Sequence, residues 1–126
     1  MLKNILLVFV GGGVGSALRY VCSCIGDKIC PNFVFPVSTF FVNIVGCFLI
    51  GLLVGITARG GMLDEKMRLI LVTGFCGGFT TFSTFAAENF KMLENGNYLL
   101  LGLYIAGSIA GGLLAVWGGK CCVYLK

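Results

Sequence analysis

The distribution of charge is the feature of this sequence that most limits its fold. No charged residue occurs from position 29 to position 58, a stretch of 30 residues, and three other long runs carry at most one charge. About 20 consecutive apolar residues span the hydrocarbon core of a bilayer as an α-helix. The sequence therefore predicts an all-α membrane protein that forms a single transmembrane domain, residues 1–126. Four transmembrane helices are expected at about residues 4–26, 36–58, 69–87 and 97–119.

Composition supports the same conclusion. Hydrophobic residues make up 58% of the chain and charged residues 11%, whereas soluble domains carry about 25% charged residues. Small residues four positions apart let membrane helices approach closely. Because four thin helices enclose a polar path poorly, an oligomer is expected. The glycine pairs with this spacing are Gly11 and Gly15, Gly51 and Gly55, and Gly107 and Gly111.

Several classes of function find no support in the residues. The chain has no histidine, and all five acids are expected at or beyond helix ends, so neither an enzyme nor a proton-coupled pump is favoured. The basic residues lie at the ends of apolar runs rather than along one stripe, so no nucleic-acid partner is expected. The seven cysteines follow no metal-ligand spacing and are interpreted as packing residues.

The third apolar run carries the most informative pattern. Gly77 and Gly78 lie near its middle, where they can unwind a helix at small steric cost. Carbonyl groups freed within a bilayer need a partner other than lipid, and in transporters such carbonyls coordinate alkali cations. The alternative is an unbroken helix whose glycines pack closely and whose hydroxyls bond back to its own carbonyls.

Hydrogen-bond donors without acids are expected near that run. Phe82 and Phe85 share a helical face and could turn their positive ring edges toward an anion, or serve only as lipid-facing bulk. Asn43 could donate to an anion or bond to a neighbouring helix, and Arg19 suits a vestibule or a structural role. Such donors fit a small anion or a polar solute. The neutral donors are Asn43, Thr80, Thr81, Ser83, Thr84, Tyr104 and Ser108.

Three segments together resemble the Fluc/CrcB fluoride channels. Residues 74–85 resemble the signature of that family, with the sequence Gly-Phe-Cys-Gly-Gly-Phe-Thr-Thr-Phe-Ser-Thr-Phe. Residues 11–20 resemble the first-helix motif and residues 42–48 the second-helix motif. The resemblance extends over essentially the whole chain and implies a fluoride-selective channel. Such a channel exports fluoride passively across a prokaryotic cell membrane and lowers its cytoplasmic concentration.

The resemblance also implies roles for individual residues and an assembly. It implies an antiparallel, dual-topology dimer in lipid, with fluoride pores along the subunit interface. A structural sodium ion would be held at the dimer centre by the backbone carbonyls of Gly77 and Thr80 from both subunits. Gly112 departs from the family pattern, in which a hydroxyl residue is common. The residues implied for the fluoride pore are Asn43, Phe82, Phe85, Ser83, Thr84, Tyr104 and Ser108.

The basic residues leave the pairing of subunits open. Six lie on the side of the termini and two or three on the other side, whereas insertion in both orientations favours balance. Either a homodimer or a heterodimer with an oppositely oriented paralogue fits this distribution. A small coupled exporter and a structural membrane subunit remain the alternative functions. The six residues are Lys3, Arg59, Lys66, Arg68, Lys120 and Lys126, and the opposite side holds Lys28, Lys91 and Arg19.

Overall fold

The computed structural model describes residues 1–125, which fold into helices joined by short connections. Four helical segments are long and apolar enough to cross a membrane, which confirms the predicted all-α membrane fold. The third of these spans Glu65–Glu94 and consists of four pieces. The elements are α1 (Leu2–Ile29), α2 (Val37–Ala58), α3 (Glu65–Arg68), the π-helical η1 (Leu69–Cys76), α4 (Gly77–Phe79), α5 (Phe82–Glu94) and α6 (Tyr98–Tyr124).

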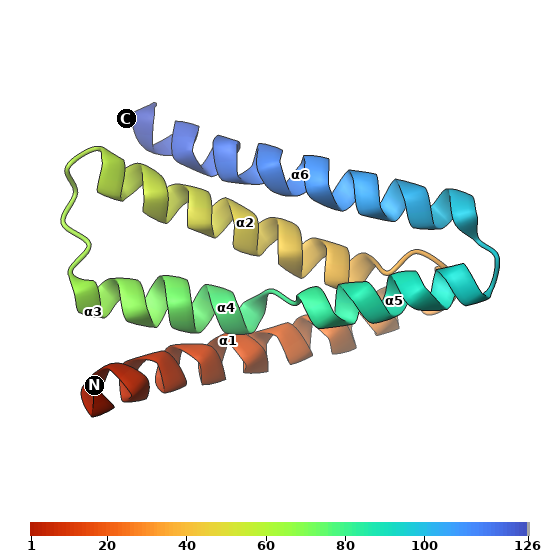
Figure 1. Ribbon diagram of the computed structural model, residues 1–126, viewed down its shortest axis with the longest axis horizontal. Helices are drawn as coiled ribbons and strands as arrows, with labels where there is room; N and C mark the ends of the chain where they lie inside the picture. The colour runs from red at the N-terminus through yellow and green to blue at the C-terminus, as the bar shows by residue number, and fades with distance from the viewer. Residues whose placement is uncertain (126) are drawn as a thin grey trace.

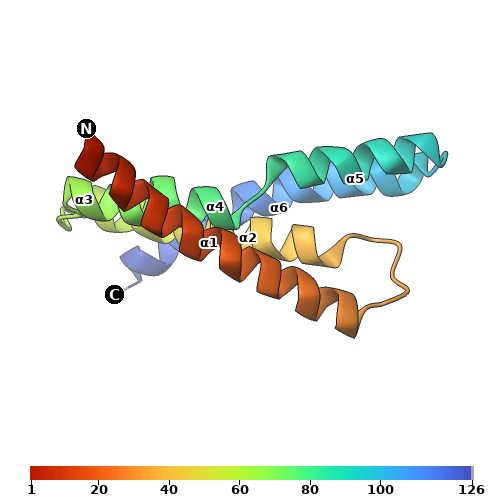
Figure 2. The ribbon, with the colours of Figure 1, turned by 90° about the horizontal axis from the view of Figure 1, so that it is seen from below.

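The four spans pack side by side in an order that differs from their order along the chain. In Figure 1, α6 lies along α2, the third span follows on the other side of α2, and α1 lies against the third span. Figure 2 shows α1 crossing beneath α4, with the connection from α1 to α2 at the end opposite the N-terminus. Both ends of the chain lie at the same end of the bundle, and α2 and α6 run parallel.

Glycines hold two of the helix contacts at short range. A Cβ atom on Gly11 would lie 2.2 Å from the Ile70 carbonyl oxygen, and one on Gly51 would lie 2.1 Å from the Val116 carbonyl oxygen. Any larger side chain at these positions would separate the backbones. By contrast, nothing lies within 4 Å of a Cβ built on Gly107. Both glycines of the first two pairs therefore meet another helix of this chain, whereas only Gly111 of the third pair does, with a Cβ that would lie 2.9 Å from Ile44 Cδ1.

The third span is interrupted, but not at the position that the sequence predicted. Gly77 has helical φ and ψ angles of −62° and −38°. The chain becomes extended at Thr80 and Thr81, where ψ is 158° and 118°. Gly78 instead allows α1 to approach, because a Cβ there would lie 2.4 Å from the Gly12 carbonyl oxygen. The predicted break near the middle of the third helix is therefore confirmed, but the glycines themselves stay helical. The extended residues are Thr80 and Thr81, and polar groups rather than glycine flexibility sustain the break.

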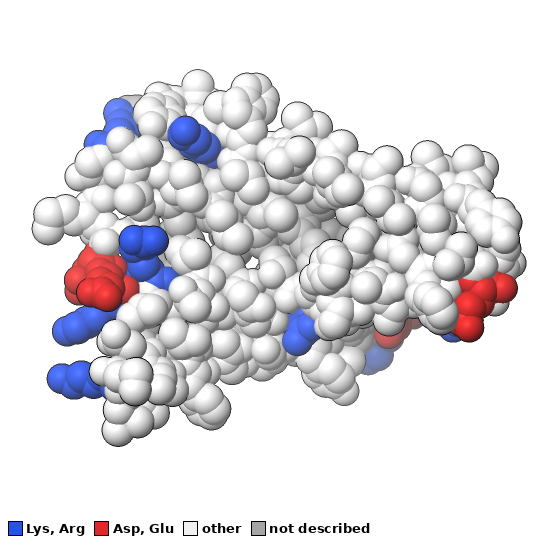
Figure 3. Space-filling view, viewed as in Figure 1, with Lys and Arg blue, Asp and Glu red and all other residues white. Residues whose placement is uncertain are grey.

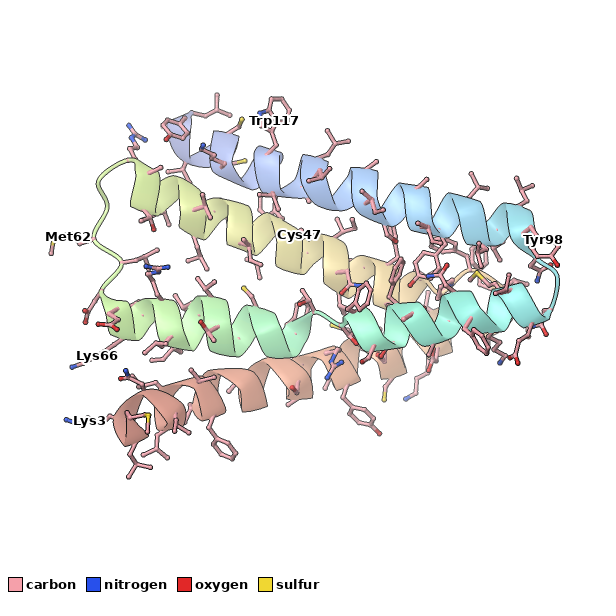
Figure 4. The ribbon with its side chains drawn as sticks, in the orientation of Figure 1. Lys3, Cys47, Met62, Lys66, Tyr98 and Trp117 are labelled. Carbon is pink, nitrogen blue, oxygen red and sulfur yellow. The ribbon has the colours of Figure 1, made fainter. Side chains whose placement is uncertain are left out.

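Most charged groups on the face drawn in Figure 3 gather toward the two ends of the bundle, and few lie between them. Lys3 and Lys66 lie at the end that holds the termini, and Tyr98 lies at the opposite end (Figure 4). Large apolar residues on α6 face outward, including Leu113 and Trp117. Lys126, which was counted with the basic residues of the terminal end, lies outside the described residues.

Candidate functional site

The amide of Asn43 bridges the break in the third span. Its Nδ2 donates to the Thr81 carbonyl oxygen at 3.1 Å, and its Oδ1 accepts from the Thr81 N–H at 2.8 Å. The side chain thus supplies both backbone partners that Thr81 loses when the helix is interrupted, as a membrane interior requires. Asn43 thus forms the interhelical bond that was one of the two alternatives for this residue. Since the amide has two N–H groups, one remains for another acceptor.

At the break, two backbone N–H groups donate to side chains instead of to the carbonyl groups that they would bond in a helix. In an uninterrupted helix the Thr81 N–H would bond to the Gly77 carbonyl, but it donates to Asn43. The Thr84 N–H would bond to the Thr80 carbonyl, but it donates to Thr81 Oγ1 at 3.2 Å. Gly77 and Thr80 are therefore among the residues near the break whose carbonyl oxygens lose their usual helical donors.

A groove of about 300 Å³ opens beside the break, between α2, α5 and α6. Six residues that the sequence singled out line it together: Asn43, Thr80, Thr81, Phe82, Phe85 and Ser108. The ring of Phe82 is 79% exposed, and its centroid lies 5.9 Å from that of Phe85. The Oγ atom of Ser108 is buried and has no hydrogen-bond partner among the described residues.

Glu88 is a functional candidate that the sequence analysis missed. Because α5 continues to Glu94, this carboxylate lies inside the helix rather than beyond its end, which corrects the expectation for the acids. Its Oε2 accepts a hydrogen bond of 2.8 Å from the Tyr104 hydroxyl, and its Oε1 accepts one from Thr39. Hydroxyl groups from α2 and α6 thus contact both oxygens of the carboxyl group. The spacing in the sequence could have identified it, because Glu88 follows Phe85 by three residues and therefore lies on the same face of a helix.

Tyr104 does not line the groove but lies buried behind Phe85, which does. Its side chain is fully buried, its ring meets that of Phe85 edge-on at 4.9 Å, and its hydroxyl proton goes to Glu88. Tyr104 therefore orients Phe85 through the ring contact. In this arrangement its hydroxyl is committed to Glu88 rather than offered to the groove.

Arg19, Ser83 and Thr84 lie away from the groove lining. Arg19 and Thr84 line a separate pocket of about 190 Å³, which Ser16, Thr39 and other hydroxyl residues also border. Ser83 is exposed and its Oγ lies 3.5 Å from Thr81 Oγ1. Arg19 as a residue is half-buried, and its place in the lining gives this second pocket a positive charge.

Comparison with known proteins decides the family. The model of the family described as "CrcB-like protein, Camphor Resistance (CrcB)" matches residues 6–120. The chain belongs to the CrcB-like family. The resemblance found in residues 11–20, 42–48 and 74–85 is thereby confirmed, and these segments supply the α1 glycines, Asn43 and the interrupted span.

Relatives in this family carry a functional name. A protein of Azobacteroides pseudotrichonymphae, "Fluoride-specific ion channel FluC", is 50% identical over 116 residues, which cover 92% of each chain. Proteins of the same name from Phocaeicola vulgatus and Oceanobacillus iheyensis are 45% and 38% identical and are covered over 96% and 95% of their lengths. With four spans and bacterial relatives, this chain is a bacterial multi-pass membrane protein.

Proposed function

We propose that this CrcB-like chain is a fluoride channel that lets fluoride leave the cell passively. The observation that carries the proposal is the groove beside the interrupted span, where Asn43, Ser108 and two phenylalanine rings meet in a family whose relatives are named fluoride channels. The ion moves down its own gradient, and the chain performs no covalent chemistry.

The groove residues replace the hydration of a small anion with neutral donors. Asn43 has a second N–H group beyond the one bonded to Thr81, and the Ser108 hydroxyl has no partner in the described structure. The edges of Phe82 and Phe85 carry positive partial charge. Donors without a full positive charge hold an anion strongly enough to replace water and weakly enough to release it.

Arg19 is proposed to act at the mouth rather than at the narrowest part of the path. Arg19, a half-buried residue, lines the hydroxyl-rich pocket next to Thr81 and Thr84, on the α1 side of the break. A positive charge in such a pocket raises the local concentration of anions. Ser83 and Thr84 are accordingly assigned to the approach to the path.

A coupled exporter remains a second candidate because Glu88 lies inside the third span. Its contacts with Thr39 and Tyr104 place an ionisable group next to Phe85. Ionisable groups within membrane spans commonly serve proton relays. The passive channel is favoured because both carboxylate oxygens already accept hydrogen bonds, so the group serves to orient Tyr104.

We further propose a dimer of oppositely oriented subunits, with fluoride paths at their interface. The exposed ring of Phe82 and the open groove fit a surface that a second subunit completes. The partner is a second copy or an oppositely oriented paralogue, and the basic residues at the terminal end favour one orientation for this chain. Cross-linking of the purified protein distinguishes the two pairings.

We also propose that a sodium ion binds at the centre of that dimer. The carbonyl oxygens of Gly77 and Thr80 lose their helical donors, and a second subunit would bring an equivalent pair. Carbonyl oxygens are suitable ligands for an alkali cation, which would fasten the two interrupted spans together. The proposal predicts that the purified dimer retains sodium after transfer to sodium-free buffer, as measured by elemental analysis. Complete loss of sodium from an intact dimer would contradict it.

Efflux from liposomes tests the channel proposal. Liposomes that contain only this protein are loaded with fluoride, and external fluoride is followed with a selective electrode. Rapid fluoride loss is expected, at a rate that an imposed pH gradient leaves unchanged. A rate controlled by the pH gradient would favour the coupled exporter, and no loss beyond that of protein-free liposomes would leave only a structural role.

A further inference from the structure

Two rows of side chains extend along the groove on parallel helices. Residues four apart lie one above another on a helix, about 6 Å apart along its axis. The row on α2 and the row on α6 each have three levels. The residues of the first level lie behind the groove and donate to Glu88, and those of the second level, Asn43 and Ser108, line the groove. The α2 row is Thr39, Asn43 and Cys47, and the α6 row is Tyr104, Ser108 and Gly112.

At the third level a thiol faces a position without a side chain. Cys47 is half-buried near the middle of α2 (Figure 4) and lines the groove together with Asn43 and Ser108. A Cβ atom built on Gly112 would lie 3.4 Å from the Cys47 sulfur. The thiol therefore lies next to the space that a residue on α6 would otherwise occupy.

We propose that Cys47 is a wall residue of the fluoride path and sets its width next to Gly112. The proposal rests on the proposed channel function and adds a residue that neither the motifs nor the family resemblance assigned to the path. A thiol is small and a weak donor, so it lets an anion pass one helical turn beyond Asn43. As a consequence, a group attached to this sulfur obstructs conduction.

The remaining cysteines supply a matched control. Cys22 borders an apolar pocket between α1 and α2, with Ile25 and Phe41 among its neighbours. That pocket shares no lining residue with the groove. An adduct on Cys22 therefore leaves the path open, whereas one on Cys47 narrows it.

Methyl methanethiosulfonate is a suitable probe because it is small and neutral. The thiolate sulfur attacks the reagent, a mixed disulfide forms, methanesulfinate leaves, and the thiol proton passes to the buffer. The experiment compares fluoride efflux from treated and untreated liposomes for the unchanged chain, Cys47→Ala and Cys22→Ala. Treatment is expected to slow efflux by at least about tenfold in the unchanged chain and in Cys22→Ala, because the adduct fills a path that must fit a small ion. Dithiothreitol should restore the rate.

The ratio of treated to untreated rates decides the proposal. For Cys47→Ala the ratio should stay near one, whatever its untreated rate. An equal block of Cys47→Ala, or no block of the unchanged chain, would overturn the role of Cys47. If Cys47→Ala does not conduct, Cys47→Ser is used in its place. If neither variant conducts, the blocked unchanged chain is analysed by mass spectrometry. An adduct on Cys47 would support the proposal, and an adduct only on other cysteines would overturn it. Untreated efflux reports separately on the channel function itself.

Discussion

The bridge between Asn43 and Thr81 makes a quantitative prediction about stability. Asn43→Leu keeps the approximate side-chain size but removes both arms of the bridge, which leaves the N–H and C=O groups of the buried Thr81 without partners. Each buried unsatisfied group costs about 1–3 kcal/mol, so the expected loss is about 2–6 kcal/mol. Unfolding by SDS in mixed micelles measures this free energy.

A control on the same helix separates the bridge from a general loss of polarity. Thr57→Val removes a hydroxyl on α2 that is exposed and bonds only to its own helix, at the Leu53 carbonyl. Its expected change in unfolding free energy is within about 0.5 kcal/mol. The reasoning would be refuted if Asn43→Leu were as stable as the unchanged chain, or if Thr57→Val lost as much stability.

The same residue should also affect conduction in a charge-dependent way. Asn43→Asp keeps an acceptor for the Thr81 N–H but sets a carboxylate oxygen against the Thr81 carbonyl and a negative charge beside the groove. Asn43→Ser is neutral and retains a donor. Per folded protein, the fluoride flux of Asn43→Asp should therefore be lower than that of Asn43→Ser. Equal fluxes would place Asn43 outside the path.

Three further changes test other parts of the account. Phe82→Ile and Phe85→Ile remove the positive ring edges but keep apolar bulk, so fluoride efflux should fall at least about tenfold with an unchanged size-exclusion profile; near-normal efflux would make both rings packing residues. Glu88→Gln replaces one acceptor by a donor facing a hydroxyl and should lower the unfolding free energy by about 1–3 kcal/mol, whereas an unchanged value would show that the cluster is not structural. Gly11→Ala should lose about 1–3 kcal/mol through overpacking, while Gly13→Ala, whose Cβ would meet nothing within 4 Å, should not; equal losses would contradict the close helix contact.

Much of the fold could be predicted because a bilayer restricts a chain to a few solutions. Long runs without charge required helices, and the glycine pair near the middle of the third run indicated an interruption. The position of the break could not be obtained from glycine content, because Gly78 is occupied by the contact with α1. What sustains the break is the fit between Asn43 and Thr81, which lie 38 residues apart in sequence.

The candidate site could be predicted only in part, for a similar reason. Phe82, Phe85 and Ser108 were found from residue type, and they do line one groove. The role of Glu88 depended on where α5 ends. The third span was predicted to end before Glu88 because that residue is charged, whereas α5 continues to Glu94. A charged residue can lie inside a helix when hydroxyl groups from neighbouring helices contact it, as Thr39 and Tyr104 do here. Thr39 gave no signal of its own, since its importance comes entirely from that contact.

Electrical recording tests passive, fluoride-selective conduction most directly. The purified protein is inserted into a planar bilayer with equal chloride on both sides and a tenfold fluoride gradient. A fluoride channel predicts a current that reverses about 59 mV from zero, because only the fluoride gradient contributes to the potential. A current that reverses at zero would show that fluoride is not selected, and the absence of any current would contradict the central claim that this chain forms an open path for fluoride.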